Sequence, residues 1–287
     1  MAKYHQLMKV SQYDTLPLKN QPLTLEMKLT EKKAIVTGGA SGIGKAIAWS
    51  FAREGADVAI FDYDLAKARA VADEIAAETK RKLFAVACDV GDSKQVTRAF
   101  AEADRLLGAV DILVNNAGII RQNEVVNTPD EEWDLIIRNN LKSVFLCSKQ
   151  AAIRMKARAK GGRIISISSI HAVLSLPSCA HYTAAKGGIE AFCRTLASEL
   201  APDRITVNCI RPGATYTELT TPMYTDAVVR SLYERVPLRQ IAQPEWIAAG
   251  AVFLASEDSC YMTGEHLTID GGYVMNGSIP GAKYWEK

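Results

Sequence analysis

The sequence of 287 residues has little that would tie it to a membrane or to nucleic acid. Its formal net charge is only +2, which gives no electrostatic basis for binding nucleic acid or an anionic membrane surface. No apolar run approaches the ~20 residues that a membrane-spanning helix needs. The first 30 residues also lack the continuous apolar segment of a secretory signal, so we interpret them as a polar arm. These absences predict a cytoplasmic protein with neither membrane nor nucleic-acid partners.

Paired cysteines are missing as well. The six cysteines are scattered singly along the chain, and no two of them have C-x-x-C spacing. Zinc ligation needs such paired spacing, and a disulfide framework usually accompanies a small secreted chain. Most of the cysteines lie in apolar surroundings, which is typical of reduced thiols used as small buried side chains. We therefore expect no metal site and no disulfide.

What the sequence does have is an alternation of short apolar runs and longer helical patterns. Strands are predicted at 33–37, 57–61, 83–87, 111–115, 163–168, 204–210 and 266–270. These runs are apolar nearly throughout, as expected for strands that are buried on both faces of a parallel sheet. Helical patterns lie between them at 43–54, 64–79, 93–107, 129–157 and 180–200. The alternation predicts an α/β fold with a Rossmann-type, doubly wound parallel sheet of about seven strands.

No composition break, linker or internal repeat divides the chain. We therefore expect a single domain over residues 31–273, preceded by the arm at 1–30 and followed by a tail at 274–287. Between residues 213 and 243, Thr, Pro and Tyr interrupt the alternation of strands and helices. Connecting segments of this kind often carry function, so we interpret 213–243 as a mobile flap.

A glycine-rich segment follows the first predicted strand and opens the first predicted helix. In TGGASGIG, Gly38, Gly42 and Gly44 let the backbone turn and come close to a ligand. A helix N-terminus offers unpaired N–H groups and a partial positive charge to a pyrophosphate. This strand–turn–helix context indicates a dinucleotide site, with a plain glycine-rich turn as the alternative.

Polar side chains follow the carboxyl ends of the next three strands, where ligands bind in open α/β sheets. Asp62 ends the second strand and can accept hydrogen bonds from both ribose hydroxyls while repelling a 2′-phosphate. No basic residue precedes Gly42, where Ser41 stands. These residues predict NAD as the coenzyme, with an ordinary turn aspartate as the alternative. Cys88-Asp89-Val90 stands at the end of the third strand, and NNAG (115–118) stands at the end of the fourth. Each motif could also be an ordinary turn, because Asn, Asp and Gly are common in turns.

Four further residues form a second group. Tyr182 and Lys186 lie four residues apart, so a helix brings a phenol and an ammonium group to one face. Ser169 ends the fifth predicted strand, and Asn140 is a polar residue among apolar positions of the helix at 129–157. Each has an ordinary alternative, such as a buried amide at Asn140 or a half-exposed tyrosine beside a surface lysine.

The conjunction of these motifs is more specific than any one of them. The sequence resembles the short-chain dehydrogenase/reductase family, since residues 30–273 carry these features in order and with the family's spacings: TGGASGIG, CDV, NNAG, Asn140, Ser169, Tyr182, Lys186, Pro212 and Gly213. The segment NNAGIIR is also similar to the sugar-acid branch, which includes gluconate and deoxygluconate dehydrogenases.

The resemblance implies an NAD(H)-dependent enzyme that interconverts a secondary alcohol and a ketone on a sugar, polyol or sugar acid. Tyr182 would transfer the proton, and Ser169 would hydrogen-bond the reacting oxygen. A cation ~4 Å from a phenol contributes about 4 kcal/mol at an effective dielectric near 20. Lys186 is therefore expected to lower the pKa of Tyr182 from its usual value near 10. Asn140, chosen over Asn139 because Leu follows it, would hold a water between Lys186 and solvent.

The resemblance also implies a larger set of cofactor and substrate contacts. Asn115 and Gly118 would support the cofactor ribose and the strand end, and Thr217 would contact the nicotinamide amide. The expected cofactor-binding residues are Gly38, Ser41, Gly42, Ile43, Gly44, Asp62, Asp89, Val90, Asn116, Gly118, Tyr182, Lys186, Pro212, Gly213, Thr215 and Thr217.

Arg121 and His171 are expected at the substrate mouth. Arg121 directly follows NNAGII and leaves the carboxyl end of the fourth predicted strand. Its guanidinium could hold the carboxylate of an aldonate or uronate with two parallel hydrogen bonds. A solvated or intersubunit arginine is the alternative.

Two other functions stay open. A 3-oxoacyl-carrier-protein reductase has the same scaffold, but that role usually calls for NADPH, against which Asp62 speaks. A non-catalytic nicotinamide-binding regulator usually loses the tyrosine or the lysine, and this chain keeps both. The resemblance further implies a small-molecule substrate and a homotetramer, with a dimer as the alternative. The apolar stretches at 182–200 and in DGGYVMNG support buried contacts between subunits.

Overall fold

One parallel sheet of seven strands forms the centre of the protein. The computed structural model describes residues 27–277, so most of the expected N-terminal arm and C-terminal tail lies outside the described residues. The strand order is β3-β2-β1-β4-β5-β6-β7, and every neighbouring pair is parallel. This arrangement confirms the predicted α/β doubly wound sheet in a single domain.

Each predicted strand is present, with ends that differ by two residues at most. The strands are β1 (Lys33–Thr37), β2 (Asp57–Asp62), β3 (Leu83–Ala87), β4 (Ile112–Asn115), β5 (Gly162–Ile167), β6 (Ile205–Pro212) and β7 (His266–Ile269). In β2 and β4 every residue is buried, because helices cover both faces of the sheet. This double burial explains why the runs are apolar throughout rather than alternating.

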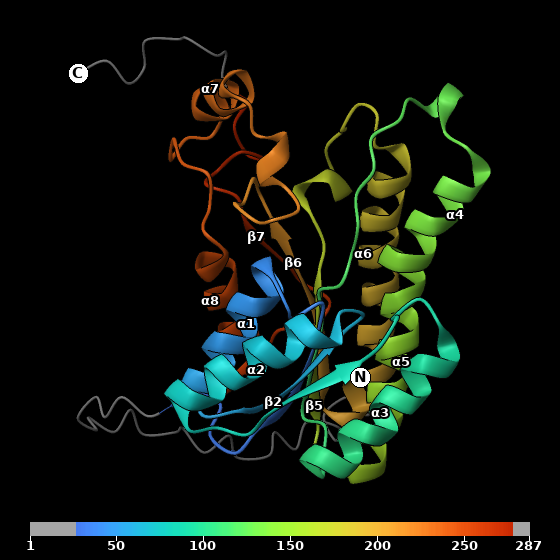
Figure 1. Ribbon diagram of the computed structural model, residues 1–287, viewed down its shortest axis with the longest axis vertical. Coiled ribbons are helices and arrows are strands. Elements are labelled where there is room, and N and C mark those ends of the chain that lie inside the picture. The colour runs from blue at the N-terminus through green and yellow to red at the C-terminus, as the bar shows by residue number, and fades with distance from the viewer. Residues whose placement is uncertain (1–26, 278–287) are drawn as a thin grey trace, which may run out of the picture.

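Helices lie on the two faces of the sheet, as Figure 1 shows. One face carries α1 (Gly42–Arg53), α2 (Leu65–Thr79) and α8 (Pro244–Ala255). The other carries α3 (Ser93–Leu107), α4 (Asp130–Ile137), α5 (Ser143–Arg158) and α6 (Ala180–Leu200). No helix within residues 27–277 is long and apolar enough to cross a bilayer.

Two hydrophobic cores hold these layers together, one on each face of the sheet. In α1, Gly44, Ile47, Ala48 and Phe51 recur at helical spacing and are all buried. On the other face, Phe100 of α3 meets Phe61 of β2 edge to face, with ring centroids 5.4 Å apart. The six cysteines are free thiols, and five of them are buried, as the sequence predicted.

The helix predicted at 129–157 is broken into three parts. A π-helical turn at Arg138–Lys142 separates α4 from α5. In this turn the N–H of Ser143 bonds to the carbonyl of Arg138, and the Ser143 hydroxyl donates to the carbonyl of Asn139 at 2.6 Å. Such insertions occur often at functional sites. The apolar spacing of the sequence gave no sign of it, because the turn keeps both flanking helices on the same face of the sheet.

The segment at 213–243 lies beyond the carboxyl ends of β6 and β7, at the top of Figure 1. It contains a short 3-10 turn, Thr221–Met223, and the helix α7 (Asp226–Arg235). Neither α7 nor α8 was expected. α8 is apolar almost throughout, so it has no amphipathic period to detect. The structure places the flap over the edge of the sheet, and its mobility stays a prediction.

Candidate active site

A cleft of about 1080 Å³ opens at the carboxyl edge of the sheet. Ordinary small-ligand pockets occupy about 300–1000 Å³, so this cleft has room for a dinucleotide and a small substrate together. Most residues expected from the sequence line it: Gly38, Ser41, Gly42, Ile43, Asp62, Asp89, Val90, Asn116, Gly118, Arg121, Ser169, His171, Tyr182, Lys186, Pro212, Gly213, Thr215 and Thr217. Gly44, Asn115 and Asn140 lie behind this lining.

The glycine-rich turn brings the N-terminus of α1 to the cleft. Gly42 has φ of 51°, a left-handed conformation that glycine adopts without strain. A Cβ on Gly44 would lie 2.2 Å from the carbonyl oxygen of Gly38, so only glycine fits at the crossing of turn and helix. Ser41, the N-cap residue, makes no side-chain cap hydrogen bond. The first-turn N–H groups therefore keep their capacity to bind a pyrophosphate.

Asp62 is held rigidly at the end of β2. Its side chain accepts hydrogen bonds from the N–H of Ala40 and the N–H of Asp64, each at 3.1 Å. Asp62 is 8% exposed, and it faces the cleft. A carboxylate oxygen has two lone pairs, so each oxygen keeps one for a further donor such as a ribose hydroxyl. The position fits the expected ribose contact.

Asn115 is the last residue of β4 and Asn116 follows it, and their side chains make different contacts. Asn116 donates to the carbonyls of Thr37 and Gly38, both at 3.0 Å, and so fixes the glycine-rich turn. Asn115 is 4% exposed and donates instead to the hydroxyl of Ser148 on α5 at 3.0 Å. Asn115 also donates to the hydroxyl of Ser166 on β5 at 3.2 Å, so it supports the strand end as expected, but it does not line the cleft where the cofactor ribose was expected. Successive side chains of a strand point to opposite faces, which turns Asn115 away from the cleft.

Asn140 fixes the loop that follows β4. It is 1% exposed, its Oδ1 accepts from the N–H of Ile119 at 2.8 Å, and its Nδ2 donates to the carbonyl of Ile119 at 2.8 Å. Asn139 instead bonds the carbonyl of Leu135 within its own helix. Asn140 is thus the buried amide behind the cleft. The Asn140 amide is already engaged by the backbone of Ile119. A water link from Asn140 to Lys186 stays a prediction.

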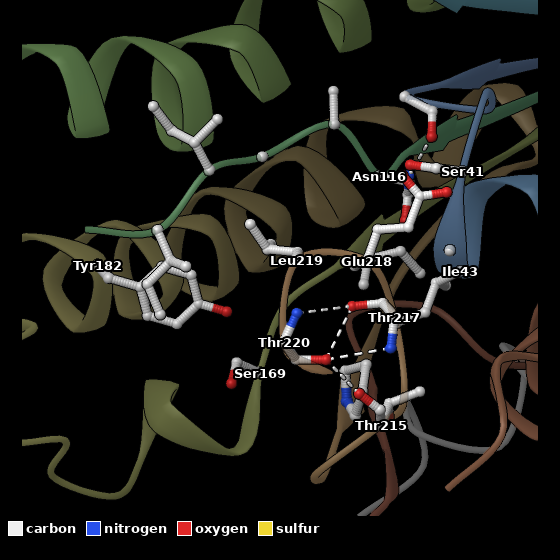
Figure 2. Close-up of a pocket in the computed structure, with 18 of the residues that line it drawn as sticks. Ser41, Ile43, Asn116, Ser169, Tyr182, Thr215, Thr217, Glu218, Leu219 and Thr220 are labelled. Carbon is white, nitrogen blue, oxygen red and sulfur yellow. Dashed lines mark hydrogen bonds between the residues drawn. The ribbon is translucent and has the colours of Figure 1, made fainter. Parts of the chain in front are cut away.

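Tyr182 and Ser169 lie together at one end of the pocket in Figure 2, across from the flap. The Ser169 hydroxyl lies on the same part of the cleft lining as Tyr182 and lowers its pKa, and it accepts the N–H of His171 at 3.1 Å. Lys186 is one helical turn further along α6, with Nζ 5.5 Å from the centre of the Tyr182 ring. Its ammonium group donates to the carbonyl of Ile167 at 2.8 Å. A phenol, a hydroxyl and a buried ammonium thus share one corner of the cleft.

Burial dominates the ionisation of this corner. It raises the pKa of Tyr182 to about 12, although the hydrogen bond with Ser169 opposes the rise. It also lowers the pKa of Lys186 to about 8. The expectation that Lys186 lowers the pKa of Tyr182 is therefore not met in this structure. Lys186 is not among the groups that shift the pKa of Tyr182, and its ammonium donates to the carbonyl of Ile167.

A network of threonines in the flap closes the other side of the pocket. Figure 2 shows the hydroxyls of Thr217 and Thr220 joined at 2.8 Å, and the Thr220 hydroxyl also bonds the carbonyl of Thr215. A Cβ on Gly42 would lie 3.2 Å from Thr217, so the flap reaches the glycine-rich turn. Glu218 pairs with Lys67 of α2 beside it. Thr220, Lys67 and Glu218 were not predicted from the sequence, in which only the cluster of threonines in TYTELTTP indicated a polar site.

The two expected substrate residues lie on the cleft but differ in character. Arg121 is exposed, and its Nη1 donates to the neighbouring carbonyl of Ile120 at 3.0 Å. Most of its guanidinium donors stay available at the rim. His171 is partly buried, and burial lowers the pKa of its ring. The Nδ1 atom of His171 is buried with no hydrogen-bond partner among the described residues.

Known proteins share this sequence and this geometry. A family model described as enoyl-(acyl carrier protein) reductase matches residues 38–274. The chain is 38% identical to a 3-oxoacyl-(acyl-carrier-protein) reductase of Chlamydia trachomatis over 245 residues, which are 85% of this chain and 98% of that protein.

Solved structures agree with the fold over nearly the same length. A 7α-hydroxysteroid dehydrogenase complexed with NADH and 7-oxo glycochenodeoxycholic acid has a TM-score of 0.83 and 33% identity, covering 86% of this chain and 96% of that chain. A candidate gluconate dehydrogenase from Agrobacterium tumefaciens has a TM-score of 0.84 and 32% identity, covering 88% of this chain and 99% of that chain.

The raised pKa of Tyr182 can be tested without substrate or cofactor. We expect the phenol to stay protonated up to about pH 10, because burial disfavours the phenolate. The measurement is the tyrosinate absorbance of the wild type minus that of Tyr182→Phe, followed as pH rises. The difference should be flat up to about pH 10. A phenolate signal from Tyr182 that appears below about pH 9 would contradict the assignment.

Proposed function

We propose a specific reaction for this chain, which belongs to the short-chain dehydrogenase/reductase family and is an oxidoreductase acting on CH–OH groups. The reaction is the NAD(H)-dependent reduction of a ketone to a secondary alcohol, together with its reverse. The observation that carries it is the corner of the cleft that Tyr182, Ser169 and Lys186 line together, with the Lys186 ammonium over the Tyr182 ring. The alternative of a non-catalytic regulator is set aside.

The proton chemistry of the corner favours the direction of reduction. A phenol with a pKa of about 12 is protonated at neutral pH, and it is a stronger acid than the secondary alcohol whose alkoxide forms from a ketone. Tyr182 would donate its proton to that oxygen, while Ser169 holds the oxygen by a hydrogen bond. In the reverse direction Tyr182 must first be ionised, so alcohol oxidation should accelerate as pH rises.

The cofactor fits the remaining length of the cleft. The N–H groups at the start of α1 would hold the pyrophosphate, and Asp62 would hold the ribose. The bound nicotinamide supplies or accepts the hydride. Thr215 and Thr217 of the flap, Pro212 and Gly213 would contact the nicotinamide half, since they line the cleft beside the corner. On the adenine side, Asp89 and Val90 line the cleft at the end of β3.

The substrate that we propose first is a 3-oxoacyl thioester. It is favoured over our expectation of a sugar or sugar acid because the similar curated proteins include 3-oxoacyl-(acyl-carrier-protein) reductases at 38% and 37% identity. The lining also supports it. The flap and the segment before α6 contribute apolar side chains that suit an acyl chain better than a polyol, namely Leu176, Met223, Val228 and Leu232.

A sugar acid is the second candidate, and two side chains favour it. Arg121 keeps guanidinium donors at the rim of the cleft, where they could hold a carboxylate with two hydrogen bonds. His171 also lines the cleft, where its imidazole could bond a hydroxyl. A candidate gluconate dehydrogenase is among the structural neighbours at 32% identity.

A substrate panel tests the reaction and separates these candidates. Acetoacetyl thioesters, gluconate and other aldonates, uronates and polyols are assayed with wild type and Tyr182→Phe. We expect the thioester to be reduced fastest and Tyr182→Phe to lose at least a hundredfold in kcat, since general acids typically contribute 10²–10⁴-fold. Cofactor affinity should stay nearly unchanged. A variant that keeps most of the wild-type rate would remove Tyr182 from the reaction. Faster turnover of an acidic sugar would favour the second candidate.

The coenzyme preference is a separate prediction that rests on Asp62. We expect a higher kcat/KM with NADH than with NADPH, because a 2′-phosphate would lie against a carboxylate that the backbone holds in place. Asp62→Asn should bring the kcat/KM values for NADH and NADPH closer together, because it removes the negative charge that repels the 2′-phosphate. Asp73→Asn, on the exposed side of α2, is the matched control and should leave the ratio unchanged. Preference for NADPH in the wild type would show that the assignment of Asp62 is wrong.

We further propose that the chain assembles as a homotetramer. Two separate regions of the surface expose large apolar side chains, as interfaces between copies would require. On α5, Phe145 and Ile153 are 44% and 53% exposed, and Phe145 meets Phe192 of α6 edge to face. On the opposite layer, Trp246 of α8 is 46% exposed. Two distinct self-complementary interfaces give a closed tetramer.

Light scattering tests the assembly directly. We expect a mass about four times the 31.3 kDa of the chain at micromolar concentration. Phe145→Glu should reduce it to a dimer by placing a charge in one interface, whereas Val126→Glu, on an exposed 3-10 turn, should not. A monomeric wild type would refute the proposal.

A further inference from the structure

His181 directly precedes Tyr182 in the first turn of α6 and is buried, with 1% of its surface exposed. Both nitrogens of its ring have partners. Nδ1 lies 2.8 Å from the backbone nitrogen of Tyr182. Nε2 lies 3.1 Å from Oε1 of Glu132, which belongs to α4. The ring therefore links a neighbouring helix to the backbone of Tyr182.

These two contacts fix the position of the proton on the ring. A backbone nitrogen only donates, so Nδ1 of His181 accepts the hydrogen bond and carries no proton. The proton of the neutral ring is then on Nε2, which donates to the carboxylate of Glu132. Glu132 thus selects the tautomer that can receive the N–H of Tyr182.

The start of α6 depends on this acceptor. The first four N–H groups of a helix have no partner within the helix. The N-cap residue, Cys179, makes no side-chain cap hydrogen bond, and its carbonyl receives the N–H of Thr183 at 3.0 Å. The N–H of Tyr182 comes before that bond and is satisfied by His181 instead. The ring therefore acts as a cap at the residue that carries the phenol.

We propose that Glu132 and His181 are positioning residues that hold the phenol of Tyr182 against Ser169; this inference rests on the proposed role of Tyr182 as proton donor. Neither Glu132 nor His181 lines the cleft, so both act through Tyr182 rather than on the substrate. A displacement of the backbone at Tyr182 moves the phenol oxygen with it. Misplacement of a reacting group by about 1 Å can lower a rate by a hundredfold.

Paired substitutions separate the hydrogen bonds from the bulk of the side chains. His181→Leu removes both bonds, whereas His181→Asn keeps an acceptor near the place of Nδ1. We expect His181→Leu to lower kcat by about ten- to a hundredfold, with KM and cofactor Kd within about threefold of wild type. His181→Asn should recover most of that loss. Glu132→Gln, which still accepts from Nε2, should resemble wild type, and Glu132→Leu should lose about three- to tenfold. Glu131→Leu, on the exposed side of α4, is the matched control and should change nothing.

The protonation of the His181 ring can be measured in the wild type even if His181→Leu does not fold. Nitrogen-15 NMR of the histidine rings should show His181 of the wild type protonated on Nε2 and, in Glu132→Leu, a mixture of tautomers. A wild-type ring protonated on Nδ1 would overturn the inference. It would also fall if His181→Leu kept the wild-type kcat, or if His181→Leu and His181→Asn lost kcat and cofactor affinity equally. A failure of the proposed function would give a different result. The wild type would then reduce no ketone, whichever nitrogen of the His181 ring carries the proton.

Discussion

A single stretch of α6 carries both Tyr182 and Lys186, and the partial removal of these two groups from water shifts the pKa of each. Burial raises the pKa of the phenol to about 12 and lowers the pKa of the ammonium to about 8, so both shifts favour the uncharged form. A protonated phenol is a proton donor at neutral pH. In the proposed reaction it would donate to a ketone oxygen, and in the opposite direction Tyr182 would first have to lose its proton.

The surrounding elements serve to place that helix against the carboxyl ends of the strands. Asn140 clamps the loop after β4, and Lys186 reaches back to the carbonyl of Ile167 at the end of β5. Asn116 ties β4 to the glycine-rich turn of α1. These contacts join three neighbouring strands at the edge where a parallel sheet receives its ligands. The cofactor and the substrate can thus meet at one point although their contacts come from distant parts of the chain.

Much of this arrangement could be predicted from the sequence, because strands buried on both faces leave continuous apolar runs. The turn at Gly42 and Gly44 was also recognisable, since backbone geometry restricts those positions to glycine. Features set by long-range packing could not be predicted. The direction in which Asn115 points depends on the pleat of β4, and the π-helical turn at Arg138–Lys142 leaves no compositional trace. The position of the Lys186 ammonium over the ring follows from its bond to Ile167, which lies nineteen residues earlier.

In the proposed reaction Tyr182 acts as an acid with a raised pKa, and the pH dependence of both reaction directions tests this role. kcat/KM for ketone reduction and for alcohol oxidation would be measured on the same enzyme from about pH 6 to pH 10. We expect a constant rate of reduction over the neutral range and a rate of oxidation that rises with pH, approaching tenfold per unit well below the pKa of Tyr182. An oxidation rate that does not change with pH, in an enzyme whose chemical step limits turnover, would contradict it.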